Sequence, residues 1–299
     1  MVAAAAAAVV LYAVRWGMLL AGLGTPVGLG RLTALRAAGQ SVSAILPTAR
    51  LGGDPLRVWL LARSEVPVPP AIASVAVDRA LEMGSGAAFA VLFGTILVQH
   101  GLPALSGIVA SLGFGLVALA VGLWVTSRRL GRGDGLVTAL ARATGLGRLR
   151  ALRGGLDVME GAEHAAAGLL AQPRRVRRAF LAGVAANLVT PLEYWLLLSA
   201  FGLPADGVAV VAAIFAAGAA HAMPVPAGIG VLEGGQMWLF GLLGHPPEVG
   251  LAVGLAVRLR ELVWVVPGLV VLAGMAWWLP RAPEAGAYGL AGADGRSAR

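Results

Sequence analysis

Charged residues stand inside long apolar stretches of this sequence. A charge at the centre of a membrane helix costs roughly 2.5–3.5 kcal/mol on insertion scales. The charges in or at the ends of apolar runs are Asp78, Arg79, Glu82, Glu193, Glu233, Arg258, Arg260 and Glu261. Arg79 precedes Glu82 by three positions, so the two would share one helical face. Arg258 and Glu261 repeat this spacing. Such pairs could tie helices together or form a polar functional site, and the sequence leaves both interpretations open.

Glycine-rich turns interrupt two of the apolar stretches and precede two further carboxylates, Asp54 and Glu233. The glycines of these turns are Gly52, Gly53, Gly228, Gly230, Gly234 and Gly235. Backbone N–H groups at the start of a helix attract anions, so each turn could cradle a phosphate, with Arg57 beside the first. A tight turn needs glycine in any case, which is the alternative explanation. We expect Asp54 and Glu233 to have no cationic partner at i+3 or i+4, and so to be candidates for gating by protonation or for binding a polar headgroup.

Residues for other kinds of chemistry are missing from the sequence. There is no cysteine, which excludes disulfides and thiolate catalysis. The histidines at 100, 164, 221 and 245 lack metal-ligand spacing, and we expect His221 to be a buried hydrogen-bonding residue. No phosphate-binding loop for ATP is present. We therefore expect no catalytic residue, no metal and no cofactor, and a protein that is not an enzyme.

The composition indicates a membrane protein. Of 299 residues, 58% are hydrophobic and 13% are charged, and the mean hydropathy is +0.82. Soluble domains are about 45–50% apolar and about 25% charged. The net charge of +8 in so apolar a chain indicates cytoplasmic loops and anionic lipid headgroups rather than nucleic acid.

The apolar runs predict the membrane architecture. Runs of about 20 residues cross a bilayer as helices, and they occur at 1–23, 71–100, 103–126, 179–202 and 248–279. Two more stretches, 31–63 and 207–244, are broken by Pro and Gly, at Pro47 and Pro226 among others. Pieces too short to cross alone predict re-entrant hairpins, and two kinked spans are the alternative. We therefore expect an all-α polytopic membrane protein, with about five full transmembrane helices and two broken or re-entrant helical hairpins in an inverted repeat.

The polar segments complete the organisation. The stretch 127–178 carries eleven arginines against four acidic residues, so it should remain in the cytoplasm. Its part 151–172 has the pattern of an amphipathic helix on the inner membrane surface. The Gly- and Ala-rich tail at 281–299 should be disordered. Residues 1–280 then form a single transmembrane domain, whose first helix we expect to be retained rather than cleaved as a signal peptide.

A duplication appears when the sequence is shifted by 179 positions. It aligns Arg79 with Arg258, Glu82 with Glu261, and the acidic residue Asp54 with Glu233. The repeats cover about 31–126 and about 207–279. With the basic segment inside, the first hairpin opens to the cytoplasm and the second to the outside. Inverted repeats with broken helices are typical of transporters whose substrate passes between the repeats.

These motifs resemble a known family. They are Gly52-Gly53-Asp54-Pro55-Leu56-Arg57, Asp78-Arg79 with Glu82, Pro226-Ala-Gly228-Ile-Gly230-Val-Leu-Glu233-Gly234-Gly235, and Arg258-Leu-Arg260-Glu261. Over about residues 10–280 the chain resembles the flippase-like transmembrane domain of lysylphosphatidylglycerol synthase, the MprF family, and most of all its hopanoid-biosynthesis-associated HpnL branch. The resemblance implies lipid translocation or export. Members usually have another helix before 1–23, and the soluble aminoacyl-transferring domain is absent here, so synthesis of the lysyl-lipid is not implied.

The sequence thus predicts a lipid transporter of the bacterial inner membrane. It would move a hopanoid or a phospholipid such as an aminoacyl-phosphatidylglycerol, along a path lined by the charged residues. Its partners would be membrane lipids, with a second copy of the chain or lipid-synthesis enzymes as further partners. A membrane-embedded transferase that uses Asp54 or Glu233 as a base is one alternative. A non-catalytic scaffold for lipid-synthesis enzymes is another.

Overall fold

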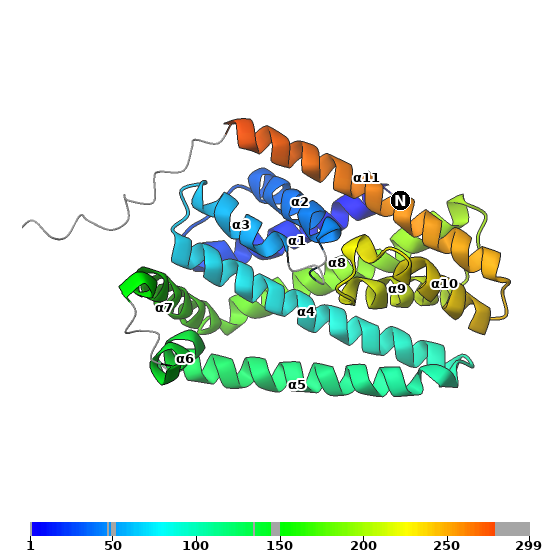
Figure 1. Ribbon diagram of the computed structural model, residues 1–299, viewed down its shortest axis with the longest axis horizontal. Helices are drawn as coiled ribbons and strands as arrows, with labels where there is room; N and C mark the ends of the chain where they lie inside the picture. The colour runs from blue at the N-terminus through cyan, green and yellow to red at the C-terminus, as the bar shows by residue number, and fades with distance from the viewer. Residues whose placement is uncertain (1, 47, 49–51, 134, 145–149, 279–299) are drawn as a thin grey trace, which may run out of the picture.

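Helices account for the regular structure of the described chain. The computed structural model describes residues 2–46, 48, 52–133, 135–144 and 150–278, and these residues contain no β-strand (Figure 1). The helices before the basic segment are α1 (Val2–Gly22), α2 (Leu29–Ile45), α3 (Gly53–Ala62), α4 (Val68–Gln99), η1 (Pro103–Leu105) and α5 (Ser106–Gly131). Those that follow are α6 (Leu136–Thr144), α7 (Arg150–Leu170), α8 (Pro173–Ala200), α9 (Gly207–Ala222), η3 (Pro226–Gly228), α10 (Val231–Leu242) and α11 (Pro247–Trp278). Pro47 and the tail predicted at 281–299 lie outside the described residues.

The long helices are the candidates for membrane spans. Four helical stretches of the described chain are long and apolar enough to cross a membrane: α1, α4, the stretch Pro103–Gly131 that contains α5, and α8. The fifth predicted span is α11, which has 32 residues and carries Arg258 and Arg260 near its middle. No residue of α5 is buried, and Phe114 is 77% exposed. Such an apolar exposed surface suits lipid and not water, so the chain is an all-α polytopic membrane protein.

Two hairpins of short helices lie between the long ones, as the sequence predicted. Helices α2 and α3 have 17 and 10 residues, and α9 and α10 have 16 and 12, against about 20 needed for a span. The two helices of each pair fold back on one another. In the first pair Gly53 meets Ser43 and Arg57 meets Gly39, and in the second pair Gln236 meets Ala213. Neither pair is therefore one continuous kinked span. The hairpins enter the bundle from opposite ends (Figure 1). Between their tips lies a small, partly open pocket of about 10 Å³, lined by residues that include Ser43, Ala220 and Gly228, with room for about one water molecule.

The helix bounds repeat at the shift seen in the sequence. Helix α11 begins 179 positions after α4 begins. The hairpin α9–α10 likewise follows α2–α3, and α8 occupies the place of α1. The structural unit therefore has four helices, α1–α4 and α8–α11, where the sequence motif began only at about residue 31.

Glycines allow the helices of the first repeat to approach closely. A Cβ at Gly53 would lie 2.0 Å from the carbonyl oxygen of Gly39, so these two glycines bring α3 against α2. A Cβ at Gly268 would lie 2.0 Å from Ser41 Oγ, which brings α11 of the second repeat against α2. These contacts place the charged side chains of several helices within hydrogen-bonding distance.

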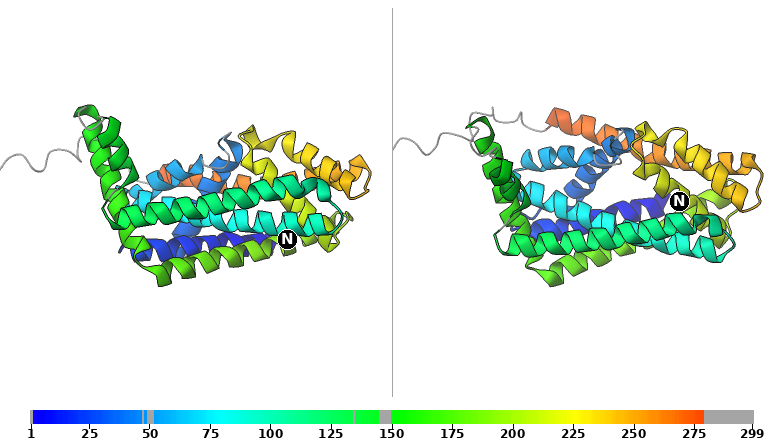
Figure 2. Two further views of the ribbon diagram at one scale, coloured as in Figure 1. Left: turned by 90° about the horizontal axis from the view of Figure 1, so that it is seen from below. Right: turned by 60° about the horizontal axis from the view of Figure 1, so that its bottom comes forward.

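The basic segment folds into two helices at one end of the bundle (Figure 2). Helix α7 confirms the helix predicted at 151–172, and α6 was not predicted. Glu163 of α7 accepts a hydrogen bond from the Val137 N–H at the start of α6, at 2.7 Å. This carboxylate satisfies an N–H that the first turn of a helix leaves without an intrahelical partner.

Candidate functional site

Asp78 lies at the centre of a buried charged cluster in the first repeat. Its carboxylate accepts hydrogen bonds from Arg15 Nε at 2.6 Å, Arg36 Nη1 at 2.9 Å and Arg57 Nη2 at 2.7 Å. Asp78 and Arg15 are fully buried, and Arg36 and Arg57 are only 5% and 3% exposed. Since the arginines come from α1, α2 and α3, one carboxylate on α4 joins all four helices of the repeat.

Two more carboxylates extend this cluster. Glu82 Oε2 accepts from Arg15 Nη2 at 2.8 Å and from Arg36 Nη2 at 2.6 Å. Asp54 accepts from Arg79 at 2.7 and 3.0 Å and from Arg57 at 3.3 Å. We call these seven residues the first-repeat cluster: Arg15, Arg36, Arg57, Arg79, Asp54, Asp78 and Glu82. Four arginines face three carboxylates, so the cluster has a net charge of +1.

Aromatic rings of α1 support the arginines. The guanidinium groups of Arg15 and Arg36 lie 4.9 and 4.5 Å from the centre of the Tyr12 ring, and that of Arg57 lies 4.0 Å from the Trp16 ring. Each is within cation–π range. Despite these contacts, two buried donors, Arg15 Nη1 and Arg57 Nε, have no hydrogen-bond partner among the described residues.

The second repeat carries a smaller version of the cluster. Arg258 Nη2 donates to Glu233 at 2.9 Å, and Nη1 donates to Glu261 at 3.1 Å. Arg258 also donates to the backbone carbonyls of Ala227 and, at 3.3 Å, Gly228 in the hairpin turn. His221 Nε2 contacts Glu261, which agrees with the hydrogen-bonding role predicted for this histidine. The second-repeat cluster comprises Glu233, Arg258, Glu261 and His221.

The two clusters share one arrangement and differ around it. In each, an arginine contacts a carboxylate 25 positions earlier and another three positions later. The remaining charges of the first cluster have no counterpart at the 179-residue shift. Arg15, Arg36, Arg57 and Asp78 align with Tyr194, Phe215, Gln236 and Val257. The repeats are therefore alike in backbone and unlike in charge. In the second cluster, Arg258 and the two glutamates have a net charge of −1 when His221 is neutral.

Arg260 and Glu193 form a separate pair between α11 and α8. Arg260 Nε and Nη2 donate to the two carboxylate oxygens at 2.6 and 2.8 Å, the bidentate geometry that arginine favours with a carboxylate. The guanidinium also lies 5.0 Å from the Tyr194 ring centre. The structure thus keeps Arg260 out of the Arg258 group, although the two are neighbours in sequence.

The glycine turns begin helices as predicted, but their N–H groups already have acceptors. Gly53 opens α3 and donates its N–H to Ser43 Oγ at 2.9 Å. Gly230 precedes α10 and donates to Glu233 Oε2 at 2.8 Å. Its φ of 80° favours glycine at this turn. In this conformation Glu233 therefore occupies the position that the cradle hypothesis gave to a phosphate.

One expectation about charge needs correction, and another is confirmed. Asp54 and Glu233 were expected to have no cationic partner at i+3 or i+4, yet Asp54 contacts Arg57 at i+3, at 3.3 Å. Both carboxylates also pair with a more distant arginine, because α4 and α11 each present one to the hairpin beside them. Arg79 and Glu82 do meet, at 3.4 Å, but Arg79 binds Asp54 more closely.

Sequence reasoning assigned neither Arg36 nor Arg15 to the first-repeat cluster, and Arg15 is the clearer case. It is the one charge in α1, a helix otherwise apolar enough to cross a membrane. That isolation was the available signal, since an intramembrane arginine requires a partner. Neither its sequence neighbours nor the repeat indicated that the partners would be Asp78 and Glu82.

A comparison with protein families assigns the chain to one of them. Residues 1–282 match the family described as the lysylphosphatidylglycerol synthase TM region. The curated proteins and the solved structures gave no match. The family match confirms the resemblance seen in the glycine and arginine motifs, while the hopanoid-associated branch stays a prediction. The chain therefore belongs to the lysylphosphatidylglycerol synthase transmembrane-region family, a membrane family with a lipid-related role.

Proposed function

We propose that the protein translocates a membrane lipid across the bacterial inner membrane, along a path between the two hairpins. One observation carries the proposal. Two short hairpins that enter from opposite ends meet at their tips, and each is held by the same arginine–carboxylate arrangement. Broken helices with charges at membrane depth are typical of transporter binding sites. In the described conformation the tips are closed, so passage requires that the hairpins separate.

The charge of the first-repeat cluster favours an anionic lipid. Its net charge is +1, and Arg15 Nη1 and Arg57 Nε are buried donors without a partner among the described residues. Buried donors of this kind normally have a hydrogen-bond acceptor. A phosphate oxygen would satisfy them and offset the charge, whereas an uncharged hopanoid would not. We therefore favour a phospholipid over a hopanoid as the substrate.

The inverted arrangement supplies a route for alternating access. Arg15, Arg36, Arg57 and Asp78 of the first cluster are buried, whereas the arginine–carboxylate groups that the two clusters share have side chains 13–26% exposed. Separation of one hairpin at a time would open the path toward one face and then toward the other. With the basic α6–α7 segment in the cytoplasm, the hairpin α2–α3 faces the cytoplasm and α9–α10 faces the outside.

The charged network disfavours the transferase alternative. A general base must be free to accept a proton, and Asp54 is held by Arg57 and Arg79 while Glu233 is held by Arg258. Ion pairing of this kind stabilises the carboxylate and weakens it as a base. We therefore propose carriage of an unmodified lipid, with no catalysed reaction.

The test is lipid sidedness in vesicles that contain the purified chain. Fluorescent phosphatidylglycerol would be placed in one leaflet, and an impermeant quencher would report its movement, with and without an imposed proton gradient. We expect faster movement than in protein-free vesicles under at least one condition. Rates equal to those of protein-free vesicles, both with and without the proton gradient, would refute translocation and favour a scaffold. A lipid product of altered mass would indicate a transferase.

Glu233→Gln supplies the variant for this assay. Glutamine retains an oxygen for the Gly230 N–H but loses the charge that Arg258 requires. We expect a folded protein with strongly reduced lipid movement. The matched control is Glu248→Gln, which removes an exposed glutamate at the start of α11 and should move lipid normally.

A further inference from the structure

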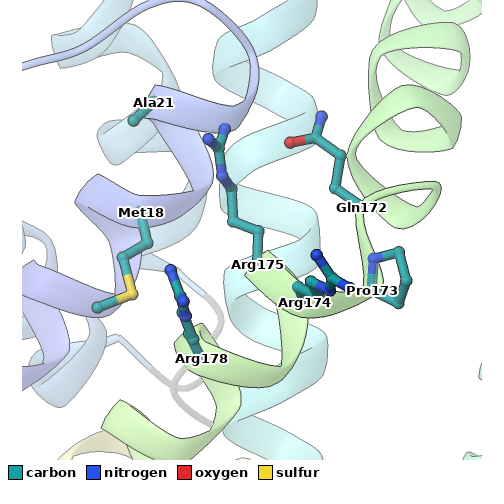
Figure 3. A pocket seen from close by; sticks show the side chains of 7 residues that line it. All are labelled: Met18, Ala21, Gln172, Pro173, Arg174, Arg175 and Arg178. Atoms are coloured by element: carbon teal, nitrogen blue, oxygen red, sulfur yellow. The ribbon is translucent and has the colours of Figure 1, made fainter.

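A large basic pocket lies far from the hairpin tips, where α1 ends and α8 begins. Its volume is about 630 Å³, within the range of about 300–1,000 Å³ usual for ligand sites. Met18 and Ala21 line it from α1, and Arg174, Arg175 and Arg178 line it from α8. Figure 3 shows the Arg175 and Arg178 side chains extending from the first turns of α8 alongside α1.

The arginines of this pocket differ from those inside the membrane. Every arginine of the two clusters, and Arg260, has a carboxylate oxygen at 2.6–2.9 Å. No carboxylate of the described residues lies within ion-pairing distance of Arg174, Arg175 or Arg178. The pocket therefore presents three guanidinium groups whose charge the described protein does not balance.

The local helix geometry adds to this positive charge. Arg178 lies three and four positions after Arg175 and Arg174, so like charges face one another on one side of the helix. They also stand in the first two turns of α8, where the helix dipole is positive and cations are unfavourable. An anion in the pocket would relieve both repulsions at once.

Contacts between α1 and α8 fix the position of one pocket arginine, Arg175. The Gln172 side chain donates to the Gly22 carbonyl at 3.0 Å and ties the start of α8 to the end of α1. A Cβ at Gly22 would lie 2.8 Å from Arg175 Cδ and Nη1, so the guanidinium rests directly on this glycine. Arg175 is thus held beside Met18 and Ala21, and the exposed side chains of Arg174 and Arg178 line the same pocket.

We propose that this pocket binds the phosphate headgroup of an anionic phospholipid, as a site separate from the translocation path. Arginine binds phosphate in a bidentate manner, which suits three unbalanced guanidinium groups. The ends of α1 and α8 are the ends of two candidate spans, where lipid headgroups lie. The apolar wall suits the glycerol and first acyl carbons. Free phosphate shares the headgroup chemistry but would not use that wall.

The test measures binding and does not depend on transport. The purified full chain in nonionic detergent would be titrated with dihexanoyl-phosphatidylglycerol, and the rise of the unfolding temperature would give the apparent Kd. Dihexanoyl-phosphatidylcholine, glycerol phosphate and inorganic phosphate are the comparison ligands. We expect phosphatidylglycerol to bind most tightly. Equal binding of phosphatidylcholine would overturn the requirement for an anionic lipid, and equal binding of the free phosphates would overturn the assignment to a lipid.

A matched pair of triple variants locates the site. Arg174→Gln, Arg175→Gln and Arg178→Gln together should weaken the binding of phosphatidylglycerol roughly tenfold or more, since three charged hydrogen-bonding groups are lost. The control replaces Arg128, Arg129 and Arg132 at the end of α5 by Gln, which removes the same charge elsewhere. An equal loss in both triples, or no loss in the pocket triple, would overturn the proposal. If the pocket triple does not fold, Arg178→Gln alone should weaken binding about threefold, and unchanged binding in that variant would refute the site.

Discussion

Asp78→Asn is the substitution that should most disturb the first repeat. The side chain is fully buried and accepts three arginine hydrogen bonds, at 2.6, 2.9 and 2.7 Å. Asparagine has nearly the same shape, so the change creates no cavity. It removes one negative charge, which raises the net charge of the cluster from +1 to +2. It also turns an N–H₂ group toward arginines that can only donate.

The size of the effect follows from the partners that remain. Removing one member of a buried ion pair costs about 3–5 kcal/mol, because the other charge stays buried. Arg15 and Arg36 retain Glu82 at 2.8 and 2.6 Å, and Arg57 retains Asp54 at 3.3 Å. No arginine is therefore left without a carboxylate. We expect the free energy of unfolding to fall by about 3 kcal/mol, at the lower end of that range.

The assay is reversible unfolding in mixed micelles by titration with a denaturing detergent, followed by tryptophan fluorescence. The control is Asp157→Asn on the exposed part of α7, which should change the free energy of unfolding by less than about 0.5 kcal/mol. A loss below about 1 kcal/mol for Asp78→Asn would refute the reasoning, since it would show that the cluster does not depend on this carboxylate.

A double variant tests whether the cost comes from unbalanced charge. Gln236 and Val257 stand in the second repeat where Arg57 and Asp78 stand in the first. Arg57→Gln with Asp78→Val installs that uncharged pair and removes one charge of each sign. The double variant should be more stable than Asp78→Val alone, because a lone buried charge costs more than none. Strictly additive losses would mean that the two side chains are not energetically coupled.

Three further predictions concern the hairpins and the topology. Arg258→Gln should lower the free energy of unfolding more than Arg79→Gln in the same titration, because Asp54 and Glu82 keep other arginines whereas Glu233 relies on Arg258; an equal loss would contradict this. Gly53→Ala should destabilise by about 1–3 kcal/mol or more, because its Cβ would overlap the Gly39 carbonyl. Gly234→Ala should be tolerated, because nothing lies within 4 Å of its Cβ position, and thermal unfolding of both variants checks the contrast. In the naturally cysteine-free chain, Leu140→Cys should react with impermeant thiol reagents only from the cytoplasm and Pro204→Cys only from outside; labelling of both from one face would refute the proposed sidedness.

The sequence predicted the fold well because membrane helices are specified locally. An apolar run of about 20 residues has only one low-energy solution in a bilayer, a helix whose backbone groups are satisfied internally. The predicted span at 71–100 accordingly matches α4 closely. The Pro and Gly clusters marked the hairpin turns for the same reason, since they cannot continue a helix. Scarce residues such as Arg79 and Arg258 revealed the repeat, because chance matches are rare among them.

The partners of the charges were decided only by the tertiary structure. The sequence could relate Arg79 to Glu82 through helical spacing, but the closer contact, to Asp54, joins residues 25 positions apart. Arg15 donates a hydrogen bond to Asp78, 63 positions later in the sequence, because α1 packs against α4. Such contacts depend on where glycines such as Gly39 and Gly53 let helices approach, and no local pattern encodes that distance. The apolar runs therefore determined which segments are helices, and packing determined which charges neutralise one another, because an ion pair forms wherever the fold brings two buried charges together.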